Sequence, residues 1–183
     1  MKKISLGLLS IFAASSLFAG NYSVDAINSN VGFSVKHMMV SNVNGKLNNV
    51  SGSFVYDEKE NSLVSLEGEI LVASINTSDE KRDTHLKADD IFDAEKFPKI
   101  TFKSTKVEKE VVYGDLTIKG VTKNVKLNLE NGGALGKKAG FTLNGKINRS
   151  EFGVTWNKVL ETGGVAVSDE VKLNIDIQGN LQN

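Results

Sequence analysis

The chain has 183 residues, with 22 basic and 22 acidic side chains, no cysteine and a hydrophobic fraction of 40%. These values are typical of a globular domain, and the balanced charge excludes a basic surface for nucleic acid or a polybasic membrane patch. The lack of cysteine excludes disulfides, thiol catalysis and cysteine metal sites, so the hydrophobic core alone must hold the fold.

The first twenty residues have the pattern of a secretory signal peptide. Lys2 and Lys3 form a positive start, residues 4–18 are apolar, and Ala19-Gly20 supply a small-residue cleavage site. The apolar stretch is short for a membrane-spanning helix, so we expect no permanent anchor. Residues 1–20 are therefore predicted to be removed on export to the periplasm, and residues 21–183 to form one binding domain.

From Asn21 onward the sequence predicts antiparallel strands. Apolar and polar residues alternate in seven short runs, which is typical of strands with one dry and one wet face. These runs lie near residues 31–35, 66–72, 100–103, 115–119, 125–130, 141–147 and 171–177.

Turns separate the runs, and glycine is abundant within them. The polar segment 57–61 reads as a hairpin loop, and 17 glycines against one proline suit curved strands. Strands with one apolar face must close on themselves or pair as a sandwich, and we favour a closed barrel of about eight strands. Gly68, Gly114 and Gly145 would then leave room inside for something other than side chains.

The segment near residues 78–96 interrupts the strand pattern. Thr77 or Ser78 is suited to cap a short helix, with Asp79 and Glu80 in its first turn. We expect a helical insert that lies beside the mouth of the barrel as a lid.

Four segments in series resemble the YceI-like family of periplasmic polyisoprenoid-binding proteins. They are DAINSNVGFSVKHM at residues 25–38, RDTHLKADDIFDAEKFPKITFKS at 82–104, GDLTIKGVTK at 114–123 and NRSEFGV at 148–154. The resemblance covers essentially the whole mature chain. It implies an extended lipocalin-like antiparallel barrel that holds an isoprenoid, such as a prenylated quinone or a polyprenyl phosphate, and no other cofactor.

Apolar residues on the strand faces are the candidates for the wall of a ligand tunnel. The alternative is that they only pack against one another in a filled core. The resemblance favours the tunnel, because a long isoprenoid needs a dry cavity more than specific polar groups. The candidates are Phe33, Val35, Phe54, Leu66, Ile70, Phe102, Leu116, Ile118, Leu127, Phe141, Leu143, Ile147 and Leu173.

Five polar residues are candidates for the mouth of the tunnel and the head group of the lipid: His37, Arg82, Asp83, His85 and Arg149. Arginine suits bidentate contact with phosphate, and histidine can hydrogen-bond a quinone carbonyl. The alternative is a structural network in which one of the arginines pairs with Asp83 or Glu151 and fixes the lid.

We expect a binding protein and not an enzyme. Two histidines far apart make no metal-ligand spacing, no Gly-x-Ser-x-Gly elbow is present, and no phosphate-binding glycine loop occurs. One alternative is a lipid-modifying enzyme with His85 as acid or base. Another is a solid-core, stress-protective barrel that binds protein partners.

Phe152 and Trp156 lie beside Arg149 in a segment that leads into a glycine-containing loop. They are read either as an aromatic gate or subunit contact, or as core residues. A symmetric homodimer is compatible with the sequence, because exposed strand edges of barrels can pair.

Overall fold

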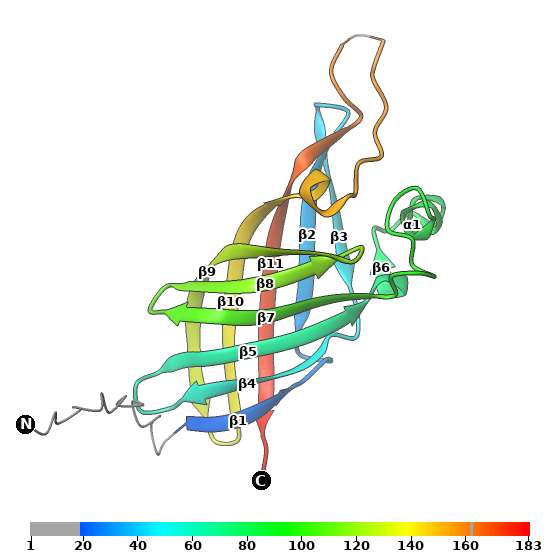
Figure 1. Cartoon of the computed structure of the whole chain (residues 1–183). Coiled ribbons are helices and arrows are strands. Elements are labelled where there is room, and N and C mark those ends of the chain that lie inside the picture. Colours follow the sequence, from blue (N-terminus) through cyan, green and yellow to red (C-terminus); the bar gives the residue numbers. More distant parts are fainter. Residues whose placement is uncertain (1–18, 162) are drawn as a thin grey trace, which may run out of the picture.

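The computed structural model describes residues 19–161 and 163–183, and in them one antiparallel sheet curls into a barrel (Figure 1). The predicted leader lies mostly outside these residues, although Ala19 and Gly20 already belong to the first strand. The strands are β1 (Ala19–Val24), β2 (Asn30–His37), β3 (Ser41–Leu47), β4 (Ser51–Asp57), β5 (Ser62–Leu71), β6 (Ile75–Asn76), β7 (Lys99–Glu108), β8 (Val111–Ile118), β9 (Val121–Leu135), β10 (Lys138–Asn148) and β11 (Val167–Leu181). Three short helices accompany them: η1 (Val72–Ser74), α1 (Glu80–Lys87) and η2 (Arg149–Phe152).

Eight strands form a closed ring. Their order is β1-β4-β5-β7-β8-β9-β10-β11, and β1 closes the ring by pairing with β11 as well as with β4. Closure leaves no unpaired strand edge in the ring, so every strand can bury its apolar face inside. The all-β barrel of about eight strands, with a short helical insert, is thus confirmed.

The other three strands lengthen the wall at one end. β11 pairs with β1 near its C-terminus and with β2 nearer its start, so β1 and β2 lie along the same strand. In the same way β3 pairs with β2 and β6, while β4 pairs with β1 and β5. β1 and β2 are therefore two parts of one long strand that is broken at residues 25–29, and β3 and β4 are two parts of another that is broken at residues 48–50. β2, β3 and β6 extend the barrel beyond these breaks.

The carboxylate of Asp25 stabilises the turn at the first break. The Asp25 carboxylate accepts hydrogen bonds from the backbone N–H of Ile27 and from the side-chain amide of Asn28, at 3.1 and 2.8 Å. These bonds stabilise the charged form, and the pKa of Asp25 falls to about 2. An aspartate that bonds to the backbone two residues on is a turn former, which explains why the strand stops here.

Aromatic rings fill the lower end of the barrel, called the base below, where β1, β4 and the C-terminus lie (Figure 1). The ring of Phe54 is stacked on Tyr22 at 5.2 Å and meets Phe141 edge-on at 5.1 Å. Phe54 also lies over Gly179, where a Cβ atom would collide with its ring. Buried aromatic side chains of this size contribute strongly to stability, so the base is a solid core.

The buried phenol of Tyr22 should titrate late. Its hydroxyl donates to the Glu58 carboxylate at 2.6 Å, and burial, then this hydrogen bond, raise the pKa of Tyr22 from 10 to about 12. The folded protein keeps this proton between those pH values, whereas the unfolded chain loses it. The contribution to stability should therefore be complete below about pH 10 and disappear as the pH rises to about 12. Phenolate absorbance should show a transition near pH 12 that Tyr22→Phe removes; a normal titration of all tyrosines would contradict this.

Candidate functional site

The helical insert is shorter than the sequence predicts and has a different cap. α1 covers Glu80–Lys87, and the rest of the insert forms turns. The cap is Asp79, whose carboxylate accepts from the backbone N–H of Arg82 at 3.0 Å, and not Thr77 or Ser78. Asp79 is extended as an N-cap requires, whereas Ser78 is in the left-handed region with φ 62°.

Buried Thr77 attaches the insert to the barrel. Its N–H and its hydroxyl donate to the Asp83 carboxylate at 2.9 and 2.5 Å. Arg82 donates from Nε to the Thr77 hydroxyl at 2.7 Å and from Nη2 to the Thr77 carbonyl at 2.9 Å. Because Thr77 follows β6 directly, both charged residues bind α1 to the wall. This agrees with the structural alternative for Asp83, although its partner is Thr77 and not an arginine.

His85 lies on the same helix but contacts other elements. Its Nε2 is 2.9 Å from the Asp90 carboxylate, and its ring meets Trp156 edge-on at 5.1 Å. The ring is half-exposed, so it retains contact with solvent. His85 therefore connects α1 both to the turns that follow it and to the segment after η2.

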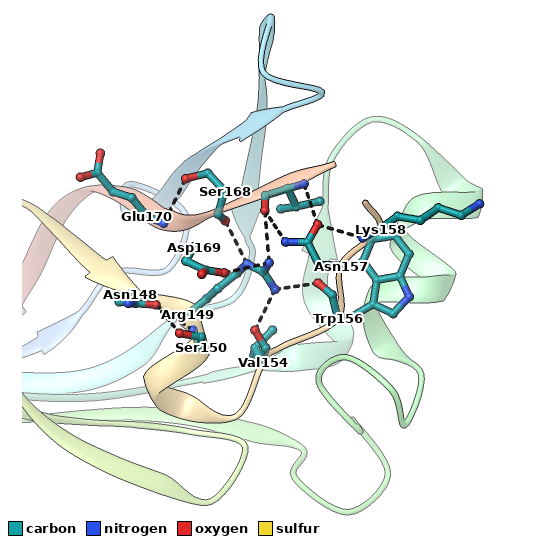
Figure 2. Close-up of polar contacts among 11 residues, drawn as sticks. Asn148, Arg149, Ser150, Val154, Trp156, Asn157, Lys158, Ser168, Asp169 and Glu170 are labelled. Carbon is teal, nitrogen blue, oxygen red and sulfur yellow. Dashed lines mark hydrogen bonds and ion pairs between the residues drawn. The ribbon is translucent and has the colours of Figure 1, made fainter. Parts of the chain in front are cut away.

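Arg149 is 9% exposed and directs its guanidinium at the protein itself. Figure 2 shows it surrounded by the loop that it organises. Nε and Nη2 donate to the carbonyls of Ser168 and Val167, Nη1 donates to those of Val154 and Trp156, and Nη2 also pairs with Asp169 at 3.1 Å. Burial lowers the pKa of Arg149, an effect that the Asp169 carboxylate opposes. All five N–H groups of an arginine are occupied in this way.

His37 lies apart from these residues, at the end of β2, where it pairs with Ser41 and Val167. The five candidates for the head group thus occupy three places: α1, η2 and the end of β2. No hydrogen bond or ion pair among the described residues joins one of these places to another.

A second apolar cluster closes the end of the barrel that faces α1. Its buried members come from the turns after α1, from β8 and from the segment around η2. Leu86 and Trp156 pack against it from outside. The buried members are Ile91, Leu116, Ile118, Phe152 and Val154. This upper cluster consists in part of turns and loops, unlike the strand-built core at the base.

An apolar cavity of about 110 Å³ lies between the two clusters. Its side chains are almost all aliphatic, apart from Phe102 and the wall residues Glu69 and Thr101, and Glu69 forms an ion pair with Lys99. The cavity is lined by Val24, Val31, Val50, Leu66, Gly68, Glu69, Ile70, Ile100, Thr101, Phe102, Leu116, Val125, Leu127, Leu143, Leu173, Ile175 and Ile177.

Seven of the thirteen residues proposed for the tunnel wall line this cavity: Leu66, Ile70, Phe102, Leu116, Leu127, Leu143 and Leu173. Phe54 and Phe141 pack in the base, and Ile118 and Ile147 in or against the upper cluster. Phe33 and Val35 lie on β2, in the extended part of the wall. The alternation of the strands also places Val31 and Val125 inside. Val24 is the last residue before the first break and Val50 lies within the second, where alternation gives no signal.

The interior glycines correct one expectation. Gly114 and Gly145 do not leave free space, because a Cβ on them would collide with Phe102 and Leu127, respectively. These side chains lie flat across the glycines of neighbouring strands. Only Gly68 of the three borders the cavity.

Two features are absent from the described residues, 19–161 and 163–183. In them no three histidine or carboxylate side chains come close enough together to hold a metal ion. None of their helices has the length and apolar character needed to cross a membrane.

Comparison with known proteins gives consistent relatives. The model of the YceI-like domain matches residues 22–179. A UPF0312 protein of Staphylococcus aureus is 37% identical over 167 residues, which cover 88% of this chain and 98% of that protein. A crystal structure of the Campylobacter jejuni YceI protein is 34% identical, with full coverage of both chains and a TM-score of 0.68.

A more distant structure shares the fold. A polyisoprenoid binding domain from Saccharophagus degradans, implicated in plant cell wall breakdown, has a TM-score of 0.68 at 14% identity, covering 88% of this chain and 98% of that domain. The match of the family model over most of the chain, together with the S. aureus relative, shows that this chain belongs to the YceI-like family.

Proposed function

We propose that this protein binds an isoprenoid-type lipid inside the barrel and carries or sequesters it, without chemical change to the lipid. The observation that carries the proposal is the apolar cavity between the base and the upper cluster. A domain of the same fold is described as polyisoprenoid binding, so the architecture is compatible with such a cargo. A prenylated quinone or a polyprenyl phosphate would fit this chemistry.

The apolar lining accounts for affinity. Each buried CH₂ group of a ligand contributes about 0.8 kcal/mol, so even part of a prenyl chain gains several kcal/mol in a dry cavity. Such a lining selects for hydrophobicity and shape over specific polar contacts. The lining also supports binding over catalysis, since Glu69 and Thr101 are the only polar side chains among its residues and Glu69 is held in an ion pair with Lys99.

The size of the cavity requires movement on binding. Sites for small molecules usually have about 300–1,000 Å³, more than the 110 Å³ present here. The base is built from paired strands, whereas the upper cluster includes turns that can move without breaking the sheet. We infer that a long chain displaces the turns after α1 and enters from that end. His85, with a half-exposed ring, is then the residue best placed for the head group.

Export to the periplasm belongs to the same proposal. Its support is the sequence of residues 1–20, with a basic start and an apolar run before a small-residue site. A carrier in that space would give a water-insoluble lipid a route between membranes.

Native mass spectrometry of the mature protein, purified from its own periplasm, tests the function directly. We expect a species heavier than the apo chain by one isoprenoid, which organic extraction releases and identifies. The apo mass alone, unchanged after polyprenyl lipids are added, would instead support the solid-core barrel that binds protein partners.

A further inference from the structure

The turn between β2 and β3 has an unusual sequence for its shape. Met38 and Met39 are its two central residues and have φ values of 51° and 63°, and Val40 N–H donates to the His37 carbonyl at 3.2 Å. This β-turn, residues 37–40, lies in a three-residue connection, because His37 pairs with Ser41. A β-turn with both central residues in the left-handed region favours Asn-Gly, because bulky side chains are strained there. Methionine at both positions is therefore a cost that the fold itself does not explain.

These residues are also exposed. Met38, Met39 and Val40 are 43%, 57% and 83% exposed, and Val159 of the neighbouring loop is 83% exposed. Met38 N–H donates to the Ala166 carbonyl at 2.8 Å, which ties the turn to that loop. Figure 1 shows the turn and the loop projecting together beyond the body of the barrel. We call Met38, Met39, Val40 and Val159 the apolar tip.

The shape and charge of the tip favour a lipid surface as its partner. A stable protein interface buries about 800 Å² on each partner and uses some 20–30 residues a side, whereas the tip offers four side chains on a projecting end. Lys36 and Lys158 adjoin it in sequence, are exposed, and have no acidic partner among the described residues. Glu161 opposes them in part, which leaves a net positive surround that complements anionic lipid head groups.

The tip is also connected to the closure of the cavity. η2 ends at Phe152, and the segment that follows it contains Val154; both residues belong to the upper cluster, and the segment reaches Val159 at the tip. Contact at the tip therefore acts on the same segment that covers the candidate lipid site.

We propose that the apolar tip inserts into the surface of an anionic bilayer and positions the barrel to take up or release its lipid. The proposal rests on the proposed function, because a carrier of membrane lipid must reach a bilayer to exchange its cargo. Partial burial of methionine and valine side chains at the acyl boundary supplies the attraction, and the two lysines add to it.

The double variant Met38→Asn/Met39→Gly tests this without loss of the fold. It supplies the preferred turn sequence, so its melting temperature should equal or exceed that of the natural protein. Flotation with vesicles of phosphatidylethanolamine and phosphatidylglycerol should show binding at least about tenfold weaker than that of the natural protein. The control is Leu135→Asn, which removes an exposed (86%) apolar side chain from the last residue of β9, at the base, and should bind as the natural protein does.

Equal vesicle binding by the natural protein and the double variant would overturn the proposal. So would a dimer in sedimentation velocity that the double variant dissociates while its vesicle binding is unchanged, because the tip would then contact a second copy. Native mass spectrometry of the bound lipid keeps the two ideas apart. If both proteins retain an isoprenoid and bind vesicles equally, membrane insertion by the apolar tip is refuted and the carrier function stands.

Discussion

Replacing Arg149 by alanine should lower the free energy of unfolding by about 3–5 kcal/mol, as expected when a buried charged partner is removed from its network. The side chain serves four backbone carbonyls and one carboxylate at once. Two of these carbonyls belong to Val154 and Trp156, just after η2, and two to Val167 and Ser168, at the start of β11. Their loss would leave acceptors without donors and free both ends of the intervening loop.

Urea unfolding at equilibrium measures this loss of stability, and two further variants serve as comparisons. Arg149→Lys keeps the charge but offers no planar fork, so it should recover only a minor part of the loss. Lys146→Ala removes an exposed ion pair between β10, just before η2, and Glu170 of β11, and should cost less than about 1 kcal/mol. If alanine at position 149 costs no more than alanine at 146, the guanidinium is not what holds the loop.

The effect matters for function because of what the loop contains. Val154 belongs to the cluster that closes the cavity, and Val159 to the apolar tip. Arg149 binds the backbone carbonyl of Val154 directly and, through the carbonyl of Trp156, fixes the backbone that leads to Val159. Its part in lipid binding is therefore to position this segment, and in this structure none of its N–H groups is left for a head group.

Strand alternation predicted most of the barrel. Leu66, Leu127 and Leu143 lie on three different strands, and the inward direction of each side chain follows from the period of two alone. The same holds for Ile70. The same reasoning cannot tell how far along the barrel axis a residue lies, because axial position depends on strand tilt and register. For this reason Phe54 and Phe141, which face inward as predicted, pack in the base and not at the cavity.

The polar residues were harder to place, for a different reason. The partners of Arg149 are backbone carbonyls in an irregular segment, and no side-chain pattern marks a carbonyl as an acceptor. Thr77 was missed as the attachment of α1 because threonine before a helix reads as a cap. The positive φ of Ser78 and the extended backbone of Asp79 make Asp79 the N-cap of α1. The Thr77 side chain is then available to bind Asp83 and Arg82.

Placing leucine at Gly68 should abolish most of the lipid binding that we propose. Gly68 lies on β5 between Leu66 and Ile70, with an ordinary strand φ, and it borders the cavity. A leucine side chain there would fill most of 110 Å³ of space. Since it displaces at least two CH₂ groups of a bound chain, the affinity for an isoprenoid should fall by at least about tenfold. Titration of the delipidated protein with a fluorescent polyprenyl lipid measures this fall.

Gly32→Leu is the matched control, because Gly32 lies next to Val31 in β2 and faces the other side of the wall. A Cβ atom at Gly32 would stand 3.1 Å from the Asn174 carbonyl oxygen, and one at Gly68 would stand 3.2 Å from that of Ser51, so both variants strain the sheet alike. Their melting temperatures should therefore be similar, while only Gly68→Leu loses the lipid. Normal binding by a folded Gly68→Leu protein would show that the lipid lies elsewhere than in this cavity. Equal weakening by both variants would show that binding responds to the stability of the wall and not to the space inside it.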